Sequence, residues 1–136
     1  MSLLELLNTT DAFARTSGIQ LTEVGEGYAR ADMVVEARHL NGGGVCQGGA
    51  IFTLADLAMA AAANSHGSLC LGINAQIHFV SSGRLGDVLT AECHELSARK
   101  LPLLEARVTR GDGTLVALVT GECYRKEQPM PYDSLM

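Results

Sequence analysis

Residues 48–66 constrain the fold of this chain more than any other segment. The segment is rich in alanine, leucine, methionine, isoleucine and phenylalanine, contains no proline, and carries one charged residue, Asp56. A helix on the surface of a protein has a polar face, and this segment has none. We therefore predict a central helix that the rest of the chain nearly encloses. His66 and the following Gly67 are typical of a helix C-terminus and predict its end.

The segments around this helix predict a short N-terminal helical region, a hairpin and a run of strands. Ser2 and Glu5 form a capping box before a leucine-rich helical stretch, and Gly18 predicts the end of that region. The glycines in the run Gly25–Gly27 indicate a hairpin between two strands. From Ile73 onward, apolar and polar residues alternate with a period of two, which is typical of a strand.

Three later segments complete a predicted antiparallel sheet. Residues 87–97, 102–110 and 114–125 each have the pattern of a long strand, and the run Gly111–Gly113 joins the last two. The tail from Glu127 carries two prolines and is expected to be mobile or to pack across a neighbouring molecule. One buried helix followed by antiparallel strands predicts an α+β fold in which the sheet wraps around the helix. We assign residues 1–136 to one domain.

Glycines cluster immediately before and at the start of the central helix. The first amides of a helix lack partners within it, and the helix dipole places partial positive charge there. Because Gly48 and Gly49 have no Cβ, a ligand carbonyl can approach these amides closely, as an oxyanion hole for acyl transfer requires. The alternative is that these glycines only allow tight packing of the helix against the sheet.

Asp56 is the second feature of the helix that indicates chemistry. A carboxylate inside an apolar helix costs several kcal/mol unless it is paired, hydrogen-bonded or open to a cavity. It is therefore a candidate general base or nucleophile with a pKa raised by burial. The alternative is a structural acid that is bonded to a nearby backbone group or arginine.

The spacing of these two features predicts a second copy of the chain. Gly48 and Asp56 are eight residues apart, so a helical rise of 1.5 Å per residue separates them by about 12 Å. One thioester carbonyl cannot contact both. If they act together, Asp56 of one chain serves a carbonyl that Gly48 of another chain holds. This predicts a homodimer with antiparallel central helices and two shared sites.

Composition excludes several other classes of function. The chain has 10 basic and 15 acidic residues, and the net charge of −5 argues against sequence-independent binding to nucleic acid. The longest apolar stretch is interrupted by Asp56 and is too short for a membrane span. The N-terminus has no signal-peptide pattern, and the four cysteines form no CxxC motif. We therefore expect a cytoplasmic protein with reduced thiols and without nucleic-acid or membrane partners.

A series of short motifs occurs in one order along most of the chain. It comprises Gly18-Ile19, Val24-Gly25-Glu26-Gly27, His39-x-Asn41-x-x-Gly44-x-x-Gln47-Gly48-Gly49, Phe52-x-Leu54-Ala55-Asp56-x-Ala58, Asn64, Gly86-Asp87, Arg99-Lys100 and Gly111-Asp112-Gly113. Together these motifs resemble the PaaI-type branch of the hotdog-fold acyl-CoA thioesterases. The resemblance implies a hotdog fold, hydrolysis of acyl-CoA thioesters, and a homotetramer built from dimers.

The resemblance also implies roles for individual residues. The catalytic acid falls on Asp56 and the carbonyl-polarising amide on Gly48, while Asn41 matches an asparagine that positions the thioester or the attacking water. Gln47 stands where most relatives have histidine; glutamine can donate a hydrogen bond but does not titrate near neutral pH. In a related branch a serine or threonine near Gly72 assists the water, and glycine cannot do so.

Several other residues are candidates for contacts with the substrate. Gly49 is expected to contact the substrate. His39, a loop histidine, is expected either to contact the substrate as well or to hold the loop in place by hydrogen bonds. The cations proposed for the coenzyme A phosphates are Arg84 and, preferred to it, the pair Arg99 and Lys100. The histidines and cysteines lack metal-ligand spacing, so we expect neither a metal nor a redox cofactor. The alternatives are a non-catalytic acyl-CoA-binding hotdog protein and, less favoured, a hotdog dehydratase.

Overall fold

The computed structural model describes residues 1–136 and contains three α-helices, two 3-10 turns and six strands. The elements in chain order are α1 (Leu3–Thr10), α2 (Ala12–Thr16), β1 (Ile19–Gly25), β2 (Tyr28–Val34), η1 (Ala37–His39), α3 (Gly48–Ala63), η2 (Asn64–His66), β3 (Ser68–Phe79), β4 (Val88–Ser97), β5 (Leu103–Thr109) and β6 (Leu115–Pro129). The expected central helix, the hairpin and the three later strands are confirmed. β3 starts at Ser68, before the alternation that begins at Ile73.

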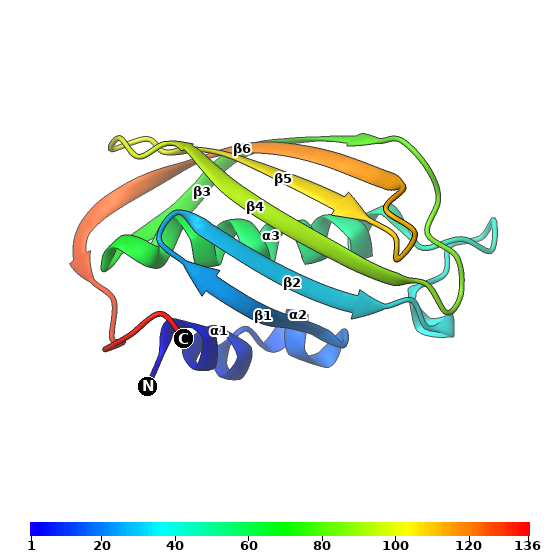
Figure 1. Ribbon diagram of the computed structural model, residues 1–136, viewed down its shortest axis with the longest axis horizontal. Helices are drawn as coiled ribbons and strands as arrows, with labels where there is room; N and C mark the ends of the chain where they lie inside the picture. The colour runs from blue at the N-terminus through cyan, green and yellow to red at the C-terminus, as the bar shows by residue number, and fades with distance from the viewer.

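All six strands form one antiparallel sheet in the order β1-β2-β4-β5-β6-β3. The sheet curls around α3, while α1 and α2 lie beside β1 at one edge (Figure 1). A curled antiparallel sheet around one long helix is the hotdog fold, so the expected α+β hotdog class is confirmed. None of the helices combines the length and apolar character that crossing a membrane requires.

α3 packs against the sheet through small and branched apolar side chains. Leu54, Ala55 and Ala58 are fully buried, as are the alanines of its last turn. Alanine side chains let the helix backbone lie close to the strands, and Leu54 fills the remaining space. Asn64 ends the helix: its side chain exchanges hydrogen bonds with the backbone of Cys70 at 2.7 and 3.1 Å and thereby joins α3 to β3.

The opposite face of α3 is open, which corrects the expectation of a nearly enclosed helix. Its exposed and half-exposed residues recur at helical spacing and form what we call the open stripe: Gly49, Phe52, Thr53, Asp56 and Ala60. Asp56 is therefore exposed in the single chain and not buried. The cause is geometric, because one curled sheet covers only one side of the helix.

β3 is the second part of the fold that lacks a covering element. It is the last strand of the sheet and pairs only with β6, so its other edge has no partner strand. Its apolar side chains are exposed, with Leu71 at 47%, Ile73 at 53% and Phe79 at 55%. The open stripe and β3 thus leave several large apolar side chains without a covering element.

The C-terminal tail packs on its own chain. β6 continues to Pro129, and the backbone of Leu3 and Leu4 donates to the carbonyls of Ser134 and Leu135 at 2.8 and 3.1 Å. The two chain ends therefore lie side by side near α1 (Figure 1). The expectation of a mobile or neighbour-bound tail was wrong, because these backbone bonds hold the tail against α1.

Burial of one face of α3 predicts that substitutions on this face lower the free energy of unfolding. Leu54→Ala removes a side chain with 0% exposure and is expected to lower the free energy of unfolding by about 2–5 kcal/mol. Leu85→Ala, at a side chain with 62% exposure, is the control and is expected to change it by less than about 0.5 kcal/mol. Urea unfolding followed by circular dichroism measures both; equal losses would contradict this packing.

Candidate active site

The start of α3 is built so that one amide stays free. Gln47 is the N-cap residue, and its side-chain carbonyl accepts a hydrogen bond from the Gly49 amide. The amides of Ala50 and Ile51 donate to the Gln47 main-chain carbonyl at 3.0 and 3.3 Å. The Gly48 amide has no acceptor in the chain. An unpaired amide at a helix N-terminus carries partial positive charge and suits a developing oxyanion.

Close neighbours disfavour a side chain at either of these glycines. A Cβ on Gly48 would lie 2.8 Å from the ring of Phe79 on β3, and one on Gly49 would lie 2.7 Å from the Gln47 side-chain oxygen. These contacts support the packing alternative for the glycines, and that alternative is compatible with an oxyanion role. The same absence of side chains leaves the Gly48 amide accessible.

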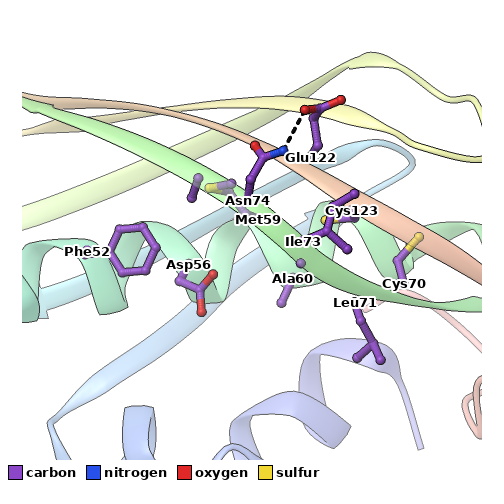
Figure 2. A pocket seen from close by; sticks show the side chains of 12 residues that line it. Phe52, Asp56, Met59, Ala60, Cys70, Leu71, Ile73, Asn74, Glu122 and Cys123 are labelled. Atoms are coloured by element: carbon purple, nitrogen blue, oxygen red, sulfur yellow. Dashed lines mark hydrogen bonds between the residues drawn. The ribbon is translucent and has the colours of Figure 1, made fainter.

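Asp56 lines a cavity of about 350 Å³ between α3 and β3, which we call the Asp56 cavity. Figure 2 shows Phe52 and Asp56 projecting from the same side of α3, with Ile73 of β3 nearby. The lining is mostly apolar; its polar groups apart from Asp56 include Asn74, which donates to Glu122 at 2.7 Å. The Asp56 carboxylate takes part in no ion pair, and neither a hydrogen bond nor a cation contributes to its pKa, so the structural-acid alternative finds no partner in the single chain.

The surroundings of Asp56 favour its protonated form. Partial desolvation by the surrounding protein, and secondarily the negative charge of Asp11 between α1 and α2, raise the pKa of the Asp56 carboxyl above the usual 3.8. A raised pKa is what a general base that works near neutral pH requires. The side chain also remains exposed enough to meet a substrate.

The thiols near the site are poor nucleophiles. Cys70 and Cys123 line the Asp56 cavity, and burial raises the pKa of both thiols, that of Cys123 to about 11. Burial also raises the pKa of Cys46, next to the glycine-rich loop. Thiols with raised pKa values stay protonated at neutral pH and are therefore unreactive.

A second cavity of about 430 Å³ lies at the other end of the open stripe, between α2 and the start of α3. We call it the loop cavity; its lining residues include Phe13, Arg38, His39, Gln47, Gly49 and Thr53. The structure thus brings His39, Gln47 and Gly49 together, as the sequence predicted. Asp56 lines the other cavity, so within one chain it is separated from the residues at the start of α3.

The loop before α3 is held by its own side chains. Both ring nitrogens of His39 are bonded to main chain: one accepts from the Glu36 amide at 2.9 Å, and the other lies 2.7 Å from the Ser17 carbonyl. The Asn41 side-chain carbonyl accepts from the amides of Gly43 and Val45. His39 therefore fixes the loop, and contact of its ring with a substrate stays a prediction. The side-chain NH₂ of Asn41 has no acceptor in the chain.

The candidate phosphate-binding cations occupy two separate places. Arg84 lines a cavity of about 320 Å³ together with Arg110, Asp87 and Asp112, and Asp112 lies 3.7 Å from Arg110. Arg99 and Lys100 lie in the β4–β5 turn and line a cleft with Arg125 and Lys126 of β6. Sequence reasoning missed the last two, although the unbroken Arg125-Lys126 pair in an acidic chain is a signal of the same kind as Arg99-Lys100.

Comparison with known proteins assigns the family. Residues 43–117, more than half of the chain, match the model of the thioesterase superfamily, and the chain belongs to that superfamily. The acyl-coenzyme A thioesterase PaaI of Escherichia coli is 34% identical over 116 residues, which cover 85% of this chain and 83% of that protein. An Archaeoglobus fulgidus protein named as a candidate esterase is 41% identical over 113 residues, covering 82% and 73%.

The solved structures agree with this assignment. The structure of the E. coli PaaI protein from the phenylacetic acid degradation operon superposes with a TM-score of 0.88 at 32% identity, covering 92% of this chain and 91% of that one. These similarities confirm the predicted resemblance to PaaI-type hotdog thioesterases.

The raised pKa of Asp56 predicts a stability change with pH. The folded chain holds this proton more tightly than the unfolded chain, so ionising Asp56 costs folding stability as the pH rises above 3.8. Asp56→Asn removes that cost and is expected to raise the Tm at neutral pH but not in acid below 3.8. Asp112→Asn is the control of opposite sign, because backbone bonding from Thr114 lowers the pKa of Asp112. Thermal unfolding across pH measures both, and a lower Tm for Asp56→Asn at neutral pH would contradict the assignment.

Proposed function

We propose that this protein hydrolyses acyl-CoA thioesters to the free acid and coenzyme A. The observation that carries the proposal is the pair of unused groups on α3: the Gly48 amide without an acceptor, and the Asp56 carboxylate without a partner in an open cavity. One can stabilise a negative oxygen and the other can deliver or activate a nucleophile. The E. coli relative that shares 34% identity is named an acyl-coenzyme A thioesterase.

The site is completed by a second copy of the chain. Within one chain Asp56 and the start of α3 lie about two helical turns apart, about 12 Å along the axis. Two α3 helices packed antiparallel through their open stripes place Asp56 of one chain beside Gly48 of the partner subunit. The same contact covers the open stripe and the exposed residues of β3, which nothing in the single chain covers. A tetramer made of two such dimers is proposed from the family resemblance.

The reaction divides between the two chains. The thioester carbonyl oxygen accepts a hydrogen bond from the Gly48 amide, which stabilises the negative charge formed when the carbonyl carbon is attacked. Asp56 of the other chain either removes a proton from the attacking water or attacks the carbonyl itself. The C–S bond then breaks, the CoA thiolate takes up a proton, and the acid leaves as its carboxylate. In the second route, water hydrolyses the acyl-enzyme anhydride.

Gln47 and Asn41 act as positioning donors in this proposal. Each side-chain carbonyl is already bonded to a backbone amide of its own loop, and each NH₂ group has no acceptor in the chain. These NH₂ groups can donate to the thioester or to the attacking water but cannot transfer protons at neutral pH. The proton transfers of the reaction therefore fall on Asp56. His39 and Gly49 are proposed as loop-cavity contacts to the acyl group, and Arg99, Lys100 and Arg84 as contacts to the CoA phosphates.

Asp56 is the residue whose removal tests the function. Asp56→Ala is expected to lower kcat at least about 100-fold, in the range of general acid–base and nucleophilic contributions, while acyl-CoA still binds. Thiol release from short, medium, long and aryl acyl-CoAs measures the activity, and calorimetry measures the binding. Asp112→Asn, in the exposed β5–β6 turn, is the control and is expected to keep full activity. Binding of acyl-CoA without thiol release by the unchanged protein would favour the non-catalytic binder.

The shared site predicts complementation between two inactive variants. Chains with Asp56→Asn and chains with Gly48→Val are each expected to be inactive, because each lacks one half of both sites. After unfolding and joint refolding, mixed dimers contain one intact site, and random pairing restores about a quarter of the activity. Size-exclusion chromatography confirms that dimers have formed. No recovery of thiol release in the mixed dimers would place both residues of a site on one chain and reject the shared arrangement.

A further inference from the structure

The cleft at the C-terminal end of α3 gathers positive charge in an acidic chain. It has a volume of about 320 Å³ and is lined by Arg99, Lys100, Arg125 and Lys126 together with Ser68 and Glu127. We call it the basic cleft. Four of the chain's ten arginine and lysine residues lie here, although the net charge of the chain is −5. Arg99, Lys100 and Lys126 make no ion pair with any carboxylate. Such unpaired charge in one concave place indicates an anionic ligand.

Arg125 is the fixed member of this cluster. Its Nη1 donates to the carbonyl of Ala63, the last residue of α3, at 3.4 Å, and its Nη2 lies 3.7 Å from the buried carboxylate of Glu95. Glu95 is in turn 2.8 Å from His66. Only one of the five N–H donors of Arg125 therefore has an acceptor in the chain. Nη2 is buried and faces Glu95, so the Nε–H is the donor of this guanidinium that remains for an anion such as phosphate at the cleft.

The cleft adjoins the cavity where the reaction is proposed to occur. Cys70 lines the Asp56 cavity and Ser68, two residues earlier on β3, lines the basic cleft. Along α3, Ala63 lies seven residues beyond Asp56, about 10 Å along the axis. An extended pantetheine arm has the length to leave its thioester at Asp56 and carry its phosphates past the end of α3.

We infer that the basic cleft binds the phosphate-bearing end of coenzyme A, with Arg125 and Lys126 joining the Arg99-Lys100 pair. This inference rests on the proposed function and adds to it the residues that select a phosphorylated carrier. Coenzyme A bears a diphosphate and a 3′-phosphate, and four cations in a cleft of this size match such a compact cluster of charge. An acidic carrier protein fits less well, because its charge is spread over a surface while the rest of this chain is acidic.

The test compares one acyl group on three carriers. Acyl-CoA, the dephospho-CoA thioester that lacks the 3′-phosphate, and the pantetheine thioester that lacks all phosphates present the same bond to Asp56. With the unchanged protein, KM is expected to rise as phosphates are removed while kcat stays similar, because the phosphates bind away from the reacting atoms. The difference in KM between the first two substrates reports the contribution of the 3′-phosphate. The difference between the second and the third reports the diphosphate together with the adenosine that it carries.

Two variants locate the effect in the cleft. Arg125→Gln and Lys126→Ala are each expected to raise KM for acyl-CoA about tenfold, the loss of one charge-assisted hydrogen bond, and to leave KM for the pantetheine thioester unchanged. Lys126→Ala keeps the proposal testable if loss of the Arg125 contacts disturbs α3. Arg107→Ala, at an exposed cation of β5 outside the cleft, is the control and is expected to change neither KM.

The outcomes separate this inference from the proposed function. Equal KM shifts for acyl-CoA and the pantetheine thioester, or no shift for either, would overturn the basic cleft as the phosphate site. If the unchanged protein hydrolyses none of the three thioesters, the proposed function fails, and calorimetry with coenzyme A itself decides the cleft. Weaker binding of coenzyme A by Lys126→Ala than by Arg107→Ala then supports the cleft, and equal binding overturns it.

Discussion

The fit of one face of α3 into the curled sheet is the contact on which the rest of the structure depends. Fully buried residues such as Leu54, Ala55 and Ala58 bring the helix backbone close to the strands. Because the sheet reaches around only that side, the opposite stripe with Asp56 stays open. The packing that forms the core therefore also presents the carboxylate, at a helix position that the sheet holds rigidly. A rigid element of this kind fixes a functional group better than a loop does.

The same helix accounts for the second half of the candidate site. Its first amides cannot bond within the helix, and the Gln47 cap satisfies only that of Gly49. The Gly48 amide is left free, and a side chain on residue 48 would displace the ring of Phe79. Helix geometry then keeps this amide and Asp56 about 12 Å apart in every copy of the chain. That distance, together with the uncovered stripe and strand edge, is the support for the proposed shared site.

The sequence predicted the helices and strands and drew attention to Asp56, because local signals carry both. Glycines marked the turns at Gly25–Gly27 and Gly111–Gly113, and Asp56 stood out as the single charge in an apolar helix. The sequence could not show that one side of α3 is open, since apolar residues on a helix do not reveal whether their own sheet or another chain covers them. It also could not predict that Arg125 lies close to Arg99 and Lys100. That contact depends on sheet pairing and on the Arg125 amide, which donates to the Lys100 carbonyl at 2.9 Å.

The use of the Gln47 side chain bears on how the chemistry is divided. Its carbonyl is committed to the helix cap, and a side-chain amide does not titrate near neutral pH, so Gln47 can orient a substrate but cannot shuttle a proton. His39, the histidine of the loop, has both ring nitrogens bonded to main chain. Burial holds the nearby Cys46 thiol in its protonated form by raising its pKa. Asp56 is then the one group at the candidate site that is open, titratable and without a partner. In the proposed reaction the attacking water gives its proton to that carboxylate or to solvent. The thiolate leaving group takes its proton from the same carboxylate or from solvent, so no second acid or base is needed.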